Sequence, residues 1–319
     1  MTSLPRAYVW SIPLRSRFRG LDVRDGVLVQ GPAGWGEFSP FWDYSDIEAR
    51  RWWAAAREAA DEGFPPPLRD RIPVNVTVPA VGEVRAGEIV RASNGCTTAK
   101  VKVAERGQSL AEEQARLEAV RAALGPTGKI RVDANGAWDV ETAVDRLHAL
   151  DRAAGGLEYA EQPCPTVPEL ARLRRLVAIP IAADESIRRA EDPMAVVRAE
   201  AADIVVLKVQ PLGGVRAALR IAEETRLPVV VSSALESSVG IAAGVALAAA
   251  LPELRHACGL ATVQLFERDV THDPMLPVDG HLPVRRVAPS TEALAAVRAD
   301  DAVQRRWHDR IRAVAGDHR

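Results

Sequence analysis

Two hydrophobic patterns alternate along most of the chain. Short runs rich in β-branched residues, which are typical of strands, are separated by stretches of Ala, Leu, Arg and Glu in which apolar positions recur with the helical period. The runs are IPVNVTVP, TTAKVKV, KIRVDAN, GLEYAEQP, IPIAADES, ADIVVLKV, PVVVSSALES and a weak last one near HACGLAT. Eight strands that alternate with helices predict parallel β/α units.

Ionisable residues end several of these runs at a regular spacing. They are Lys102, Asp133, Glu161, Asp184 and Lys208, with separations of 31, 28, 23 and 24 residues. This spacing is close to one unit of a (β/α)8 barrel. An open doubly wound sheet concentrates its site at one switch point, whereas here five successive strands end in ionisable groups. We therefore predict a closed (β/α)8-type barrel as the catalytic domain, over residues 71–281.

The first part of the chain has a different pattern. Of the 15 aromatic residues of the chain, 11 lie between Tyr8 and Phe64, which predicts a separate unit with its own aromatic core. Within it, AYVWSIPL and GVLVQ are predicted strands, and the Gly-rich GPAGWGEFSPF is predicted to be a turn or loop. Residues 43–46 offer N-cap side chains for a helix that ends at Gly63.

Two further segments define the predicted domain organisation. The Pro-rich FPPPLRDR predicts a domain boundary, so that residues 1–70 form an N-terminal α+β domain. The C-terminal tail, residues 282–319, is strand-like and then helical and basic, and we expect it to pack back on the N-terminal domain.

Composition and charge narrow the functional classes. The 41 basic and 43 acidic residues give a net charge of -2, which argues against a nucleic-acid or membrane-surface partner. The 13-residue apolar run from Val239 to Leu251 is short for a membrane span and predicts a buried core helix, and the N-terminal segment does not resemble a signal peptide. The three cysteines, Cys96, Cys164 and Cys258, form no pattern, so we expect a reduced cytoplasmic location. The oligomeric state, monomer or homo-oligomer, is left open.

Three carboxylates form a candidate metal site. Asp133, Glu161 and Asp184 end three consecutive predicted strands, and the active groups of such a barrel gather at the carboxyl ends of its strands. Three hard oxygen donors without a nearby His or Cys favour Mg2+, with Mn2+ as an alternative. Taken singly, each carboxylate is better explained as a helix N-cap or a solvated loop side chain, but the three together at strand ends, with lysines on both flanking strands, favour a metal site.

The lysines indicate an active site more specifically than the carboxylates do. Lys100 and Lys102 alternate with two valines, so both lysines point to one face of the strand, which we expect to be the barrel interior. Lys208 lies between apolar residues on another covered strand. A lysine is a weak base at neutral pH, but a second ammonium group and a bound divalent cation both lower its pKa. The alternative is an exposed strand with solvated lysines.

Several polar residues are candidates for a supporting role. Arg131 and Asn135 share a face with Asp133, so that Arg131 is expected to neutralise the acidic cluster from below, or else to form an outward salt bridge. Ser232, Ser233 and Glu236 end the seventh run, where they either line the mouth of the barrel or cap the next helix.

The motifs together resemble a known family over nearly the whole chain. AKVKV, RVDANGAW, EQP, ADES and LKVQPLGG, in this order, resemble the enolase superfamily and specifically its muconate-lactonizing-like branch. Within that branch, SRFRGLDVRDGVLV, GPAGWGEFSPF and SSALESSVG are similar to the short actinobacterial type of o-succinylbenzoate synthase. The resemblance implies a (β/α)8-type barrel with an α+β capping domain formed from the N-terminal segment and the C-terminal tail.

The resemblance also implies an activity and a set of roles. The activity is that of a carbon–oxygen lyase, which dehydrates 2-succinyl-6-hydroxy-2,4-cyclohexadiene-1-carboxylate to 2-succinylbenzoate in menaquinone biosynthesis through an enediolate. Carried over by motif, Asp133, Glu161 and Asp184 bind Mg2+. Lys102 removes the proton α to the ring carboxylate and returns it to the leaving hydroxyl, and Lys208 stabilises the enolate from the opposite face.

Five further residues are expected to bind substrate or to support the site: Lys100, Arg131, Asn135, Ser232 and Arg19. Residues 17–20 are expected to close over the site, so that Arg19 meets the succinyl carboxylate.

Other functions remain compatible with the same residues. N-succinylamino acid racemases and dipeptide epimerases share the lysine pair and the metal. A barrel without activity, acting as a binding protein, would not need the complete set of three acids and two lysines. A Schiff-base aldolase using Lys208 would need no metal.

Overall fold

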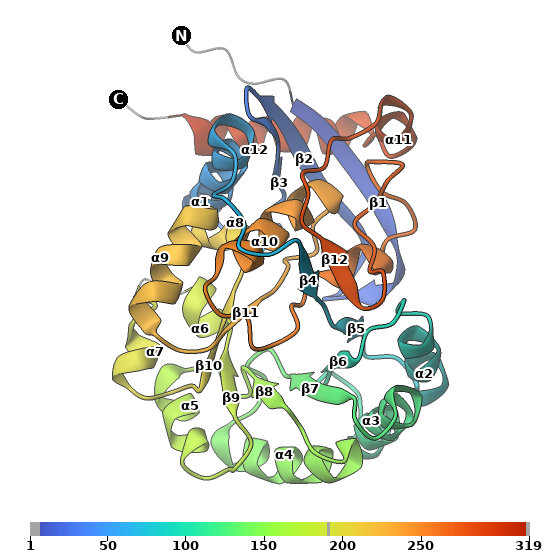
Figure 1. Ribbon diagram of the computed structural model, residues 1–319, viewed down its shortest axis with the longest axis vertical. Helices are drawn as coiled ribbons and strands as arrows, with labels where there is room; N and C mark the ends of the chain where they lie inside the picture. The colour runs from blue at the N-terminus through green and yellow to red at the C-terminus, as the bar shows by residue number, and fades with distance from the viewer. Residues whose placement is uncertain (1–6, 190–191, 317–319) are drawn as a thin grey trace.

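The computed structural model describes residues 7–189 and 192–316, and shows two units stacked on each other (Figure 1). One is a small antiparallel sheet with helices beside it, built from both ends of the chain. The other is a parallel barrel ringed by helices. The six residues that begin the predicted N-terminal domain and the last three of the predicted tail lie outside the described residues.

The N-terminal unit is a three-stranded sheet with one helix against it. Its strands are β1 (Ala7–Phe18), β2 (Leu21–Gly31) and β3 (Gly34–Phe38), antiparallel and in the order β1-β2-β3. Helix α1 (Asp46–Arg57) begins at Ser45, whose side chain accepts from the backbone N–H of Glu48 in a capping box. It continues as the π-helix η1 (Glu58–Glu62) and ends at Gly63, as predicted.

Strand β3 corrects one prediction. The glycines of GPAGWGEFSPF predict a turn or loop, but residues 34–38 pair with β2. A Cβ atom on Gly36 would lie 2.0 Å from the backbone oxygen of Ala56. The glycine is therefore needed because strand and helix backbones touch here, and not because the chain turns.

Seven strands form the curled parallel sheet of the barrel, in the order β11-β10-β9-β8-β7-β6-β5. They are β5 (Val76–Val78), β6 (Thr98–Lys102), β7 (Lys129–Asp133), β8 (Tyr159–Glu161), β9 (Ile181–Ala183), β10 (Ile204–Leu207) and β11 (Val229–Val231). The helices around them are α2 (Glu83–Arg91), α3 (Leu110–Leu124), α4 (Val140–Ala154), α5 (Val167–Arg174), α6 (Glu185–Arg188), α7 (Ala195–Arg198), α8 (Val209–Leu212), α9 (Val215–Thr225) and α10 (Ser238–Ala250).

The weak eighth run closes the barrel. Cys258 forms a parallel bridge with Val74, just before β5, and Gly259 forms one with Ser232, just after β11. The backbone N–H of Gly259 donates to Val231 at 2.8 Å, and that of Asn75 donates to Cys258 at 3.0 Å. The eighth position is therefore filled by single bridges rather than by a regular strand.

The C-terminal segment returns to the N-terminal sheet. After η2 (Ala261–Leu265), strand β12 (His281–Pro283) pairs with β4 (Arg71–Pro73), and α11 (Thr291–Ala296) and α12 (Asp301–Ala315) follow. Trp307 of α12 is fully buried and packs edge-on against Phe38. Arg310 donates to the backbone oxygens of Phe41 and Tyr44. The tail thus packs on the N-terminal unit as predicted, whereas the predicted boundaries near residues 70 and 281 stay a prediction.

Helix α10 carries the long apolar run of the chain. Twelve of its 13 residues are buried, so the run is a core helix. Within residues 7–189 and 192–316, no helix has the length and apolar character that crossing a membrane requires.

A buried polar cluster joins the two units. The carboxyl group of Glu37, on β3, accepts hydrogen bonds from Ser39 and from the backbone N–H groups of Ser237 and Gly240 at the start of α10. The guanidinium of Arg24, on β2, donates to the backbone oxygen of Leu235 at 3.1 Å. These bonds fix the loop after β11 to the N-terminal sheet.

Candidate active site

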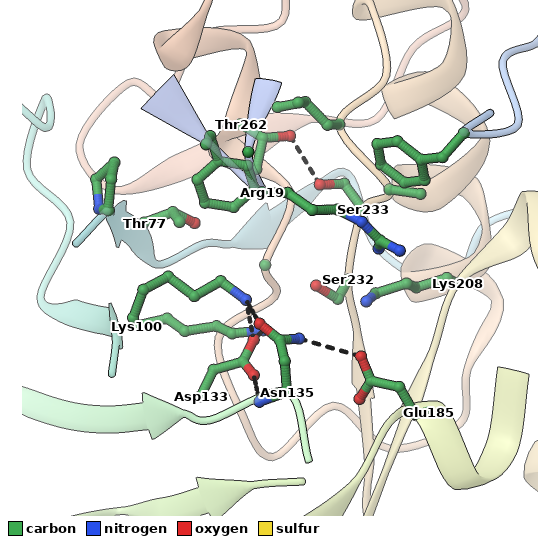
Figure 2. Close-up of a pocket in the computed structure, with 18 of the residues that line it drawn as sticks. Arg19, Thr77, Lys100, Asp133, Asn135, Glu185, Lys208, Ser232, Ser233 and Thr262 are labelled. Carbon is green, nitrogen blue, oxygen red and sulfur yellow. Dashed lines mark hydrogen bonds and ion pairs between the residues drawn. The ribbon is translucent and has the colours of Figure 1, made fainter. Parts of the chain in front are cut away.

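A cavity of about 500 Å³ lies where the mouth of the barrel faces the N-terminal unit (Figure 2). Residues 17–20, at the end of β1, form part of its wall together with Phe41 and Tyr44. The rest of the wall comes from the carboxyl ends of barrel strands and the loops that follow them. The site is therefore shared by segments far apart in the sequence.

The three acidic residues occupy the expected positions. Asp133 ends β7, Glu161 ends β8 and Asp184 directly follows β9, and all three are at most 1% exposed. Asp184 stands at the start of α6, but its side chain accepts no capping hydrogen bond there. Neither alternative, a solvated carboxylate or a helix N-cap, describes these side chains.

Three lysines pair with these acids. Lys100 Nζ lies 2.6 Å from Glu161 Oε1 and 2.8 Å from Asp133 Oδ2, and Lys102 Nζ lies 2.5 Å from the same Asp133 oxygen. Lys208 Nζ lies 2.6 Å from Asp184 Oδ2. Figure 2 shows Lys208 on the other side of the cavity from Lys100 and Asp133. The prediction that the K-x-K lysines enter the barrel is confirmed, because the intervening Val101 is packed in the core.

The charges of this cluster shift the pKa values of its members. Burial and the charge of Lys100 lower the pKa of Lys102, although Asp133 opposes them. Burial raises the pKa of Glu161 to about 7, and the charges of Asp133 and Asp184 add to this rise while Lys100 opposes it. Burial acts against ionisation of Asp133, but the two neighbouring lysines outweigh it and hold its pKa below the usual range. The carboxylates thus interact with one another and require compensating positive charge.

The donor chemistry of this cluster fits a hard divalent cation. Three buried carboxylates, without His or Cys, are an oxygen-only set. As the side chains stand, no group of three His, Cys, Asp or Glu within the described part of the chain is close enough to hold an ion. The lysine nitrogens lie among the carboxylates instead, so the acids must turn toward one another to bind a metal.

Of the other predicted residues, some line the cavity and some do not. Asn135, Ser232 and Arg19 line it. Asn135 Oδ1 accepts from Lys102 Nζ at 2.8 Å, and Arg19 pairs with Asp43 at 3.1 Å. Ser233 also lines the cavity, whereas Glu236 is buried behind it and accepts from the backbone N–H of Ala234.

Arg131 lies deeper in the barrel than the three acids. Its side chain is fully buried, so it is not an outward salt bridge, and no hydrogen bond joins it to the acids. Its pKa is raised, against the effect of burial, by Tyr159, Glu158 and in part by the charge of Glu161. Its guanidinium pairs with Glu158 at 2.6 Å and donates to Tyr159 Oη at 3.0 Å and to Ala257 O at 2.8 Å. Its place two residues before Asp133 puts it one layer deeper, where it satisfies the polar groups of the barrel floor.

Two residues of α6, Glu185 and Arg188, belong to the site but were not predicted from the sequence. Arg188 is buried and pairs with Asp184 at 3.0 Å and with Glu185 at 2.6 Å. Glu185 Oε1 accepts from Asn135 Nδ2 at 3.1 Å, which connects α6 to Lys102 through Asn135. The i, i+4 spacing of Asp184 and Arg188 is the signal that could have shown the first pair.

Two segments of the chain match families of known proteins. Residues 84–289 match the family described as Enolase C-terminal domain-like. Residues 9–60 match the one described as Enolase N-terminal domain-like.

Curated relatives are similar over nearly their whole length. The o-succinylbenzoate synthase of Thermobifida fusca is 66% identical over 305 residues, which cover 96% of this chain and 94% of the relative. The o-succinylbenzoate synthase of Mycobacterium tuberculosis (strain H37Rv) is 56% identical over 310 residues, which cover 97% of this chain and 94% of the relative.

Solved structures share the fold. A muconate lactonizing enzyme from Pseudomonas fluorescens, complexed with muconolactone, has a TM-score of 0.79 at 21% identity, covering 92% of this chain and 98% of that chain. The dipeptide epimerase from Cytophaga hutchinsonii, complexed with Mg and a dipeptide, has a TM-score of 0.75 at 23% identity, covering 92% of this chain and 97% of that chain. The predicted barrel with an N-terminal capping unit is thereby confirmed.

Proposed function

Because this chain belongs to the enolase superfamily and, within it, to the o-succinylbenzoate synthase family, we propose that it dehydrates 2-succinyl-6-hydroxy-2,4-cyclohexadiene-1-carboxylate to 2-succinylbenzoate. The chain is then a hydro-lyase acting on a small carboxylate, in a step of menaquinone biosynthesis. The geometric observation that supports this reaction best is the cluster of three buried carboxylates with amines on two sides of one cavity.

The proposed base is Lys102. Its amine borders the cavity, and its lowered pKa favours the neutral form that can accept a proton from carbon. In the forward reaction Lys102 takes the proton α to the ring carboxylate and returns it to the ring hydroxyl, which leaves as water, and the ring becomes aromatic. Asn135 holds the amine at 2.8 Å and so restricts where it points.

Lys208 is proposed to act from the other side. Its ammonium group is held by Asp184 at 2.6 Å and its side chain is 10% exposed, so it presents a fixed positive charge to the cavity. Negative charge accumulates on the substrate as the proton leaves, and a pre-oriented ammonium stabilises that charge more than it stabilises the ground state.

Asp133, Glu161 and Asp184 are proposed to hold Mg2+ when the site is loaded. Sites of this superfamily combine a Lys or His base with one or two Mg2+ ions. The bound ion supplies Lewis-acid stabilisation of the substrate carboxylate. Carboxylates that held the ion would pair less closely with the lysine amines, and Lys102 would then be free to accept a proton.

The capping segment is proposed to bind the distant end of the substrate. Arg19 and Arg17 line the cavity on the side of the N-terminal unit. A succinyl carboxylate that reaches this wall would compete with Asp43 for Arg19. We also propose a cytoplasmic location without a nucleic-acid or membrane partner.

The direct test is turnover of the cyclohexadiene substrate by the purified protein. We expect ultraviolet absorbance of the aromatic product to grow with Mg2+, to stop with EDTA and to return when Mg2+ is restored. Racemisation with α-deuterium exchange of N-succinylamino acids, without formation of the aromatic product, would contradict the proposal. Trapping of the substrate by borohydride without metal would instead identify a Schiff base.

A further inference from the structure

Two buried side chains of helix α3 face the end of strand β6, one helical turn apart. Glu113 and Arg116 are each only 1% exposed, although both carry charge and neither lines the cavity. Charged groups are rarely buried so completely unless their hydrogen bonds serve a specific arrangement. Helix α3 covers β6 from outside the barrel, so these groups approach Lys102 from behind (Figure 1).

The guanidinium of Arg116 fixes the backbone of Lys102. Its Nη1 donates to the carbonyl oxygen of Lys102 at 2.9 Å, its Nε donates to Val81 O at 2.5 Å and its Nη2 donates to Gln108 Oε1 at 2.6 Å. Gln108 in turn donates to Ala80 O at 3.0 Å, and Ala80 lines the cavity. One side chain therefore joins the end of β6 to the loop after β5.

Glu113 fixes the next part of the same segment. Its Oε1 accepts from the backbone N–H of Ala104 at 2.6 Å, and its Oε2 pairs with Arg146 at 3.3 Å. Ala104 has a φ of +61°, a left-handed conformation that is unfavourable for a residue with a Cβ. The bond from Glu113 helps to hold the chain in this turn directly after the lysine.

Strand pairing alone leaves this position unsupported on one side. Toward β7, Lys102 pairs with Asp133 and Val103 N donates to Asp133 O at 3.1 Å. Toward β5, the ladder ends at the pair of Val78 with Val101, so no strand residue lies opposite Lys102. Arg116 supplies the missing support there.

We propose that Arg116, with Glu113, is a positioning residue that holds the backbone of Lys102 at the distance from substrate which proton transfer requires. This inference rests on the proposed role of Lys102 as the base. A displacement of the base of about 1 Å costs on the order of 100-fold in rate, so a small shift of this backbone is measurable.

The first test compares Arg116→Lys with a matched change on the same helix. Arg121 also donates to backbone carbonyls, those of Ala154, Gly125 and Gly128, but none of these residues lines the cavity. We expect Arg116→Lys to lower kcat about tenfold or more with little change in KM, whereas Arg121→Lys keeps the wild-type kcat. Substrate deuterated at the carbon that loses the proton should show a larger isotope effect with Arg116→Lys, because proton transfer becomes slower than the other steps.

The second test is independent of activity. Hydrogen exchange of a peptide spanning residues 102–108 should be faster in Arg116→Lys than in wild type, and unchanged in Arg121→Lys. If wild type shows no turnover, the proposed function fails. The exchange data alone then test whether Arg116 holds the backbone of the Lys102 segment. If wild type is active but Arg116→Lys retains its kcat and isotope effect, or Arg121→Lys loses as much, the positioning role is overturned.

A milder variant guards against loss of folding. Gln108→Ala removes one hydrogen bond from Arg116 at a half-buried position, and should shift the isotope effect and the exchange rate in the same direction by a smaller amount. Should Arg116→Lys fail to fold, wild-type values for Gln108→Ala in both measurements would overturn the inference.

Discussion

Only four of the 41 basic residues of the chain are lysines, namely Lys100, Lys102, Lys129 and Lys208. Three of them pair with the acids at the cavity, and Lys129 is 57% exposed at the other end of its strand. A guanidinium does not lose its proton in proteins, whereas a buried amine can. Every basic residue other than these four is arginine, and three of the four lysines lie at the proposed catalytic site.

Replacement of Lys102 by Ala should nearly abolish turnover. A positioned general base contributes roughly 100- to 10,000-fold, so we expect kcat to fall by at least about 100-fold while the protein remains folded. Product absorbance measures the loss, and Lys129→Ala is the matched control that should keep full activity. A Lys102→Ala protein with wild-type kcat would disprove the assignment of the base.

Replacement of Arg19 by Ala should weaken substrate binding. Arg19 is one-third exposed and its guanidinium lies 4.2 Å from the ring centre of Phe41, so the change removes a charge without opening the core. A charge-assisted hydrogen bond of about 1.5–3 kcal/mol corresponds to a rise in KM of roughly 10- to 100-fold. Arg15→Ala, on strand β1 just before the turn that holds Arg19 but bonded to Phe266 O, should leave KM unchanged. An unaltered KM in Arg19→Ala would remove this residue from the substrate site.

The sequence pattern predicted which side chains enter the barrel better than it predicted the partners of those side chains. The period-2 alternation of Lys100 and Lys102 with valines fixed which way the lysines point, because a strand in this barrel has one inner and one outer face. The same rule placed Arg131 on one face with Asp133 but left an outward salt bridge open, and it carries no information on depth along the barrel, so the partner Glu158 was missed. Pairs between the two units, such as Arg24 with Leu235 O, had no local signal in the sequence.

Among the elements, hydrophobic runs predicted the regular strands well. Val, Ile and Leu dominate β10 and β11, and both were found as predicted. The eighth strand is reduced to bridges at Cys258 and Gly259, which explains why its run was weak. Strand β3 was missed because two of its five residues are glycines, and the close contact of Gly36 with α1 becomes visible only in the folded chain.

Replacement of Gly36 by Ala should therefore destabilise the N-terminal unit. The added methyl would meet the backbone oxygen of Ala56, which cannot move without displacing α1. Overpacking of this kind typically costs about 1–3 kcal/mol. The urea midpoint measures the loss, and Gly82→Ala, whose Cβ would have no heavy atom within 4 Å, is the control. Equal midpoints for the two variants would contradict the close contact.

At the scale of the whole molecule, the junction of the two units should make stability depend on pH. Burial and the charge of Glu236 raise the pKa of Glu37 from 4.5 to about 8, while hydrogen bonds from Ser237 and Ser39 oppose the rise. Between these two values the folded protein keeps a proton that the unfolded chain has lost. The free energy of unfolding must therefore fall as pH rises through this window, by at most about 1.4 kcal/mol per pH unit from this group.

The variant Glu37→Gln should reduce this dependence. It cannot ionise, so its urea midpoint should decline less between pH 6 and about 8 than that of wild type. Glu118→Gln, at an exposed position of α3, should follow the wild-type curve. A Glu37→Gln curve parallel to that of wild type would show that this carboxyl does not titrate in the window.

The return of α12 to the first sheet has a consequence for biosynthesis. Trp307 completes the packing around Phe38, so a ribosome that has made the sheet and the entire barrel still carries an unfinished aromatic core. Phe38 and its neighbours therefore stay exposed to other proteins until α12 has been synthesised. Chaperones that shield apolar surface are needed for longest at the N-terminal sheet, which is translated before the barrel and before α12.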